Sequence, residues 1–255
     1  MNVHRDDLDS ILDKIIEDIF KDNIKFFEKS GISTDKKPKL KIIESLPSIV
    51  EIALTFWMMQ KHRRIYGLYV QSLGTLYIIK KPLKRIIYRL LNTLYTNKII
   101  VENLSSKTTE GYSIIGIRLS ELSKIIYPAY INWNDIKNVA AKIPVDIIMI
   151  HEFLHFFISK NELVTYTLEY LIYFYKNGFY KYPEAYKIIK ENIKQCKEYI
   201  EKEKKPDSYE LRRCLANIII HENRSSEELN IKDIIEKIKY LSEEDIINEI
   251  KSYKI

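Results

Sequence analysis

Glycine, proline and cysteine are all scarce in this chain of 255 residues, which contains 6 glycines, 7 prolines and 2 cysteines. Few glycines and prolines leave few sites for sharp turns, so the sequence predicts long stretches of regular structure. Hydrophobic residues make up 46% of the chain and charged residues 30%. This balance is typical of a globular protein and excludes a chain that is disordered throughout. The length suffices for one large domain or two small ones with a sizeable core.

The two cysteines, Cys196 and Cys214, are too few and too far apart in sequence for a cysteine-based zinc site. They also exclude a disulfide-rich scaffold. Their number and spacing fit a reducing compartment, and we expect a cytoplasmic protein.

Long apolar runs are missing as well. The most apolar stretches, 49–59, 143–158 and 163–175, all carry charged residues, and none gives the roughly 20 clean apolar residues of a spanning helix. The N-terminus has acids from Asp6 onward and does not resemble a secretory signal. We therefore expect no membrane partner, and an intramembrane protease is disfavoured.

Positive charge is only in mild excess, at a net +6. Three basic clusters lie at 36–41, 61–64 and 80–85, the latter two near tyrosines. Solvated helix faces explain such clusters more often than phosphate contacts do. A nucleic-acid partner is possible on this evidence but not favoured.

Periodic apolar positions predict mainly helices. A pair of β-branched runs, 98–101 and 112–119, predicts two paired strands, and Pro144 predicts a break between two helices. Ser242 and Asp245 have the spacing of a capping box. The helices are expected at 6–29, 47–66, 82–96, 134–142, 145–159, 162–176, 183–203, 207–222, 231–240 and 242–252.

The motif that carries chemistry is His-Glu-Phe-Leu-His at positions 151–155. It has the HExxH pattern and falls inside a predicted helix, where residues four apart share one face. His151 and His155 could therefore direct two imidazoles at one zinc ion. Glu152 lies beside them and could take a proton from a water on that ion, then pass it to a leaving amine. Two histidines and a glutamate on an otherwise apolar helix would be costly without such a role.

These residues resemble the motif of the zincin metallopeptidases, in which the histidines bind zinc and the glutamate is the general base. The metzincin branch is excluded, because it would need glycine and histidine where Ile158 and Asn161 stand. The gluzincin branch takes its third ligand from a glutamate on the next helix. In a helical hairpin that turns near position 160, Glu169 lies level with the motif, so we favour it. Glu162 could be a second-shell partner or the ligand itself.

A peptidase also needs donors for the developing oxyanion. In gluzincin-like enzymes a downstream tyrosine or histidine serves, which makes Tyr166, Tyr170, Tyr173 and His221 candidates. Substrate in zincins lies along an edge strand, for which 112–119 is the candidate, with 128–133 as a possible rim.

The expected fold is α+β and predominantly helical, with a zincin-like core whose small β-sheet packs on the active-site helix. The expected regions are an N-terminal helical region (1–96), the catalytic core (97–180) and a C-terminal helical region (181–255). The expected function is zinc-dependent hydrolysis of peptide bonds in a protein or peptide substrate. The alternatives are a helical nucleic-acid-binding or regulatory protein, or a zincin scaffold without peptidase activity.

Overall fold

The computed structural model describes residues 5–30, 32, 36–46, 66–103, 113–114, 117–118, 136–158, 161–181, 183–224 and 230–254. This part of the chain is mostly helical with a small sheet, which confirms the predicted α+β class. It divides into two compact units, which are described one at a time. The helix predicted at 47–66 and the rim at 128–133 lie outside the described residues.

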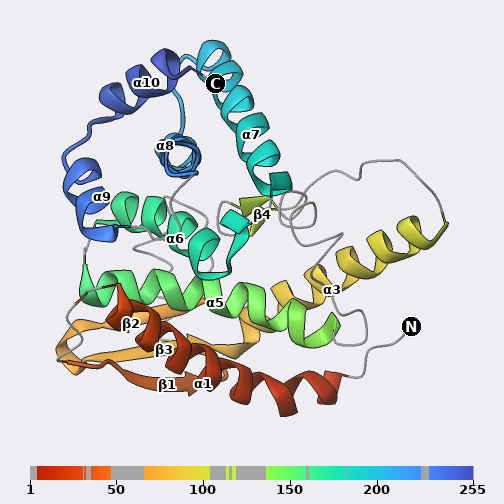
Figure 1. The fold of residues 1–255 in the computed structure, drawn as a ribbon. Coiled ribbons are helices and arrows are strands. Elements are labelled where there is room, and N and C mark those ends of the chain that lie inside the picture. The colour runs from red at the N-terminus through yellow and green to blue at the C-terminus, as the bar shows by residue number, and fades with distance from the viewer. Residues whose placement is uncertain are drawn as a thin grey trace. The chain divides into compact units, whose positions relative to one another are not determined.

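The first unit consists of Met1–Lys25, Thr34–Thr108 and Asn132–Phe156. Its three strands pair in the order β1-β3-β2, with β1 parallel and β2 antiparallel to β3 (Figure 1). A short turn that ends at Gly74, with φ 56°, joins β2 to β3. The elements of the unit are α1 (Arg5–Lys29, which belongs to it as far as Lys25), β1 (Lys39–Ile43), β2 (Gly67–Val70), β3 (Thr75–Ile79), α3 (Lys80–Asn103) and α5 (Ile136–Phe157).

This sheet is not the predicted one. The segment 98–101 was predicted as a strand and lies in α3, so the prediction was wrong. The segment 112–119 contains two strands of two residues, β4 (Ser113–Ile114) and β5 (Ile117–Arg118), which pair with each other. Short β-branched runs fit a buried helix as well as a strand, because apolar content alone does not decide between them.

Helix α5 is continuous through Pro144, which corrects the predicted break at that residue. Proline lacks the N–H that would bond to the preceding turn, at a cost of about 3 kcal/mol in a helix interior. The residues on both sides of it are buried, among them Ala141, Ile143 and Val145. Burial of both halves of the helix offsets the lost hydrogen bond.

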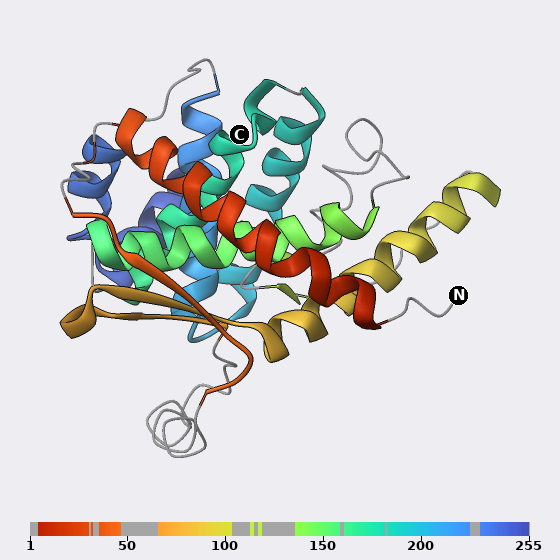
Figure 2. The same cartoon turned by 90° about the horizontal axis from the view of Figure 1, so that it is seen from below.

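Helix α5 packs on the sheet and on α1 within the first unit. Tyr69 of β2 meets Phe156 edge to face at 5.1 Å, and Phe20 of α1 meets Phe153 at 5.3 Å. Asn23 of α1 donates a buried hydrogen bond of 3.0 Å to Asp146. Figure 2 shows α5 running alongside the strands. A small sheet thus packs on the helix that carries the HExxH motif, as expected, but it comes from earlier in the chain.

The second unit consists of Phe26–Ser33, Thr109–Ile131 and Phe157–Ile255. Helix α8 packs against α6, α7 and α10 (Figure 1). Asp207 caps α8, and Ser242 with Asp245 forms the predicted capping box. The helices of this unit are α6 (Glu162–Lys176), α7 (Pro183–Lys202), α8 (Ser208–Glu222), α9 (Ile231–Ile238) and α10 (Glu243–Ser252), with a short 3₁₀ turn at Phe179–Lys181.

The cysteines form a disulfide between α7 and α8, Cys196–Cys214. The number and spacing of the two cysteines therefore no longer support a reducing compartment, since the side chains are bonded to each other. Helix packing brings the two side chains together, which their sequence spacing did not indicate. The same unit buries Arg212, which donates to the carbonyl oxygens of Ile238 and Leu241 where α9 ends. The predicted division into 1–96, 97–180 and 181–255 stays a prediction.

Candidate metal centre

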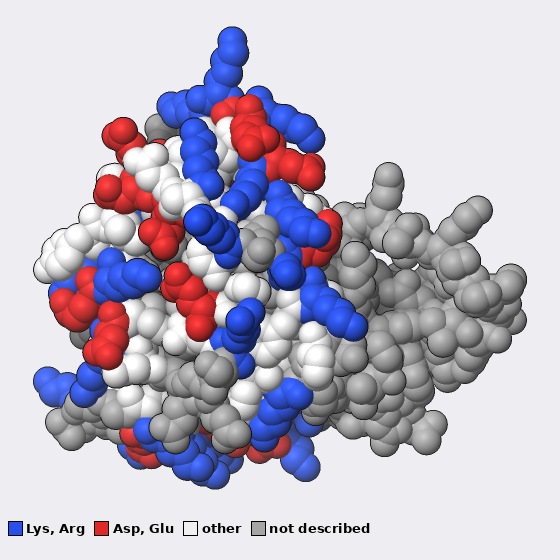
Figure 3. All heavy atoms as spheres, turned by 45° about the horizontal axis from the view of Figure 1, so that its top comes forward, with Lys and Arg blue, Asp and Glu red and all other residues white. Residues whose placement is uncertain are grey.

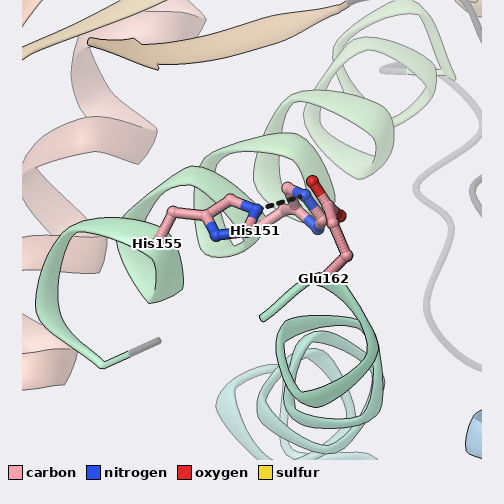
Figure 4. Close-up of side chains that lie close together, drawn as sticks. All are labelled: His151, His155 and Glu162. Carbon is pink, nitrogen blue, oxygen red and sulfur yellow. Dashed lines mark hydrogen bonds between the residues drawn. The ribbon is translucent and has the colours of Figure 1, made fainter. Parts of the chain in front are cut away.

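The two motif histidines lie one turn apart on α5, on the same face, as the spacing predicts. Their Nε2 atoms are 3.1 Å apart, and the ring planes are inclined at 83° (Figure 4). Both residues are partly buried in a helix that is otherwise strongly apolar. The local fold therefore brings two nitrogen ligands to one point.

This spacing suits zinc. Two imidazole nitrogens at about 2.05 Å from a tetrahedral zinc ion lie roughly 3.3 Å apart. The observed Nε2–Nε2 distance of 3.1 Å is close to that value. A hydrogen bond between the rings also fits, but it requires that one nitrogen carries a proton and the other does not. The donor set and its spacing are thus compatible with a bound zinc ion.

Glu162 is the third residue of a group that could hold a metal ion together with these histidines. The three residues each offer one ligand atom, and these atoms lie within 4.8 Å of one another (Figure 4). Glu162 is the first residue of α6, directly after the N-cap Asn161, whose side chain accepts from the N–H groups of Leu163 and Val164. No other group of three His, Cys, Asp or Glu residues that could hold an ion occurs among the residues whose placement is described.

The favoured ligand Glu169 lies two turns further along α6 and is only 1% exposed. It is not part of the group just described. The alternative that the sequence left open, Glu162, is the carboxylate in that group. The choice of Glu169 as ligand stays a prediction, to be tested against Glu162.

The candidate general base, Glu152, lies next to His151 on α5 and is 7% exposed. The start of β2 comes very close to it. A Cβ atom at Gly67 would lie 2.9 Å from Oε1 of Glu152. The sequence gives no sign of a role for Gly67, because it does not indicate which strand lies against the helix that carries Glu152.

The four candidate oxyanion donors all have neighbours within the second unit. Tyr166 meets the ring of Tyr209 edge to face at 5.2 Å, and Tyr170 donates to Asn217 at 3.4 Å. Tyr173 packs near Phe179. Their roles in catalysis stay predictions.

His221 lies at the end of α8, where its Nδ1 is 2.8 Å from the hydroxyl oxygen of Tyr253. Burial, together with the positive charges of Arg224 and Lys190, lowers the pKa of His221 below its ordinary value. The contact ties the last helices together, and the role of His221 as an oxyanion donor also stays a prediction.

The basic cluster at 80–85 is partly neutralised inside the first unit. Lys80 lies 3.0 Å from Asp13, and Lys84 lies 2.9 Å from Glu44. On the face drawn in Figure 3, Asp and Glu side chains lie scattered among Lys and Arg side chains. Because phosphate binding needs clustered positive charge, this mixture of charges argues against a nucleic-acid surface on this face. The cluster at 61–64 lies outside the described residues.

No protein-family model matches the chain, and the searches of curated proteins and of solved structures also give no match. None of the described helices is both long and apolar enough to cross a bilayer.

Proposed function

We propose that the protein is a zinc-dependent metallopeptidase of the gluzincin-like type. The observation that carries the proposal is the pair of Nε2 atoms 3.1 Å apart on one face of α5, grouped with the carboxylate of Glu162. Two histidines and one carboxylate are a common ligand set for a catalytic zinc ion, because they leave a fourth position open.

His151, His155 and Glu162 hold the ion in this proposal, with Glu169 as the alternative third ligand. When bound, zinc would act as a Lewis acid that polarises a carbonyl group and lowers the pKa of water. Glu152 accepts the proton of the attacking water and delivers it to the amine that leaves. Its position on the same turn as His151 puts the base beside the metal ligands.

The sheet next to α5 suits an extended peptide substrate. Strand β2 pairs with β3, and no other described strand lies along its second edge. An extended peptide can add to such an edge through main-chain hydrogen bonds. Since β2 also meets Glu152 and Phe156, we assign the substrate-binding edge to β2 rather than to 112–119.

The test combines metal analysis with the variant Glu152→Gln. We expect the purified protein to hold one zinc ion per chain and to cleave unfolded protein in a chelator-sensitive way. Glu152→Gln should keep zinc and lose about 10²- to 10⁴-fold of the cleavage rate, since that is the usual contribution of a general base. Glu191→Gln, on the exposed face of α7, is the matched control and should retain full activity.

Cleavage by Glu152→Gln at the wild-type rate would contradict the assigned base. Zinc binding without cleavage of any substrate would favour the alternative of a zincin scaffold without peptidase activity. Salt-dependent binding of DNA without zinc would favour the nucleic-acid alternative. The cytoplasmic location expected from the sequence stays a prediction, which cell fractionation tests.

A further inference from the structure

Gly67 opens β2 at the point where this strand meets α5. A Cβ atom at this position would lie 2.8 Å from Cγ of Glu152 and 2.8 Å from Cγ2 of Ile148. It would also lie 2.9 Å from Oε1 of Glu152. These separations are well below carbon–carbon contact distance, so no side chain larger than hydrogen fits there without movement.

Gly67 is needed for space and not for conformation. The glycines with positive φ in the described chain are Gly74 and Gly178. Gly74, which ends the turn between β2 and β3, shows the opposite case: its φ is 56°, and a Cβ there would meet nothing within 4 Å. The two glycines of one hairpin therefore serve different purposes, and only Gly67 touches the candidate base.

We propose that Gly67 is a positioning residue that sets the place of the Glu152 carboxylate. This inference rests on the proposed function, in which Glu152 is the base. A glutamate side chain has three rotatable bonds, and the bare main chain at Gly67 limits where its carboxylate can lie. A methyl group at position 67 would displace the carboxylate by at least about 0.5 Å to restore normal contact distances.

The neighbours of the methyl group decide which atoms move. The β2 main chain is held by its pairing with β3, where Gly67 lies opposite Ile78. Ile148 is 3% exposed, so a close-packed interior resists its displacement. The methyl group would meet Glu152 at both Cγ and Oε1, so the Glu152 side chain, which is 7% exposed, has to shift as well. The change therefore moves the candidate base whether or not Ile148 also moves.

The test compares Gly67→Ala with Gly74→Ala. Gly67→Ala should keep its zinc and its KM and lose about 10- to 100-fold in kcat, since a displacement of 1 Å can cost 10²-fold. Gly74→Ala should lower the melting temperature, because alanine is strained at that φ, and keep kcat. Wild-type kcat in folded Gly67→Ala would overturn the proposal.

A second variant separates positioning from packing. Ile148→Ala added to Gly67→Ala removes the clash with Ile148 and leaves the clash with Glu152. We expect kcat to stay low in the double variant, because the clash with Glu152 remains, whatever the cavity left at Ile148 costs in stability. Recovery of kcat in this double variant would show that Gly67 acts through packing, which would overturn the proposal even if the single variant does not fold.

A measurement on the metal-free protein separates this inference from the proposed function. The carboxyl carbon of Glu152, labelled with ¹³C and assigned by its absence in Glu152→Gln, should shift its NMR signal in Gly67→Ala and not in Gly74→Ala. An unshifted signal would overturn the role of Gly67. Absence of zinc binding and cleavage in the wild-type protein would instead overturn the proposed function, whatever the signal does.

Discussion

Histidine makes two different contacts in this chain, one with a second histidine and one with a tyrosine. On α5, Nε2 of His151 faces Nε2 of His155 at 3.1 Å. At the end of α8, Nδ1 of His221 faces the hydroxyl oxygen of Tyr253 at 2.8 Å. A hydroxyl group can both donate and accept, so it suits an imidazole in either protonation state. Two imidazole nitrogens are complementary only when they share one proton.

The difference identifies which pair suits an ion. Zinc binds neutral imidazoles and can take the place of the shared proton between two ring nitrogens. The pair on α5 is grouped with a carboxylate, whereas the pair on α8 ties the helix to the C-terminal segment. The chemistry of the partner atom thus makes the α5 pair the candidate metal site and the α8 contact a structural one.

The largest effect is expected when a ligand is removed from the α5 pair. His155→Ala should lose stoichiometric zinc, with affinity lowered by well over 100-fold, more than the loss of an outer-shell partner costs. His221→Ala removes the other kind of histidine and should keep one zinc per chain. Zinc content after dialysis, measured by mass spectrometry, checks both. Stoichiometric zinc in His155→Ala would contradict the ligand assignment.

Loss of the disulfide should have the next largest effect and should act on stability alone. Cys196 and Cys214 are separated by 18 positions, and a crosslink over a loop of this size stabilises by about 3 kcal/mol. Cys196→Ala with Cys214→Ala should lower the free energy of unfolding by about that amount and keep zinc. Denaturant unfolding with and without reductant measures this effect. Identical curves for oxidised and reduced wild-type protein would contradict it.

The next prediction concerns which glutamate is the third ligand of the proposed α5 site. Glu162→Gln should weaken zinc binding, but less than His155→Ala does, because it removes the charge of the ligand, keeps an amide oxygen and leaves the helix cap at Asn161 in place. Glu169→Gln is the matched variant on the same helix. Competition with a zinc chelator gives both affinities. A larger loss in Glu169→Gln would restore the ligand that the sequence favoured.

The smallest effect concerns His221. Burial and nearby positive charge lower its folded-state pKa below the ordinary value of 6.5, so the folded protein favours neutral imidazole. The contribution of neutral His221 to the stability of the folded protein is therefore complete above pH 6.5 and declines as the pH falls through and below that value. His221→Phe should lose about 1 kcal/mol at pH 7.5, the usual value of one hydrogen bond.

The decisive measurement is how the difference in stability between wild type and His221→Phe changes with pH. The gap in melting temperature between wild type and His221→Phe should narrow below pH 6.5. Tyr253→Phe, which removes the same hydrogen bond but keeps the imidazole, is the control. A gap that widens on acidification would contradict the lowered pKa.

Several elements could be predicted because their signals are local. The helix at 162–176 begins and ends where the sequence predicts, since Asn161 caps it and Gly178, with φ 70°, follows its end. The capping box at Ser242 is likewise a property of four neighbouring residues. The placement of His151 and His155 on one face required only that 151–155 be helical.

Other elements could not be predicted because distant contacts decide them. The run 98–101 is as apolar as a strand but continues α3, and Pro144 stays inside α5 because both halves of the helix are buried. Strand β1 begins inside the basic cluster at 36–41, where the sequence predicts no strand, yet it pairs with β3. At Pro144 the burial of the neighbouring side chains outweighs the local preference, and β1 is defined by its pairing with β3.

The sequence by itself determined that two imidazoles and a carboxylate of the HExxH motif share one stretch of helix, because helix periodicity depends only on neighbouring residues. Only the tertiary structure decided that Gly67 meets Glu152, that Cys196 joins Cys214, and which strands form the sheet. These contacts join segments that are far apart in the chain, and they arise when apolar surfaces are buried together rather than from any preference of single residues.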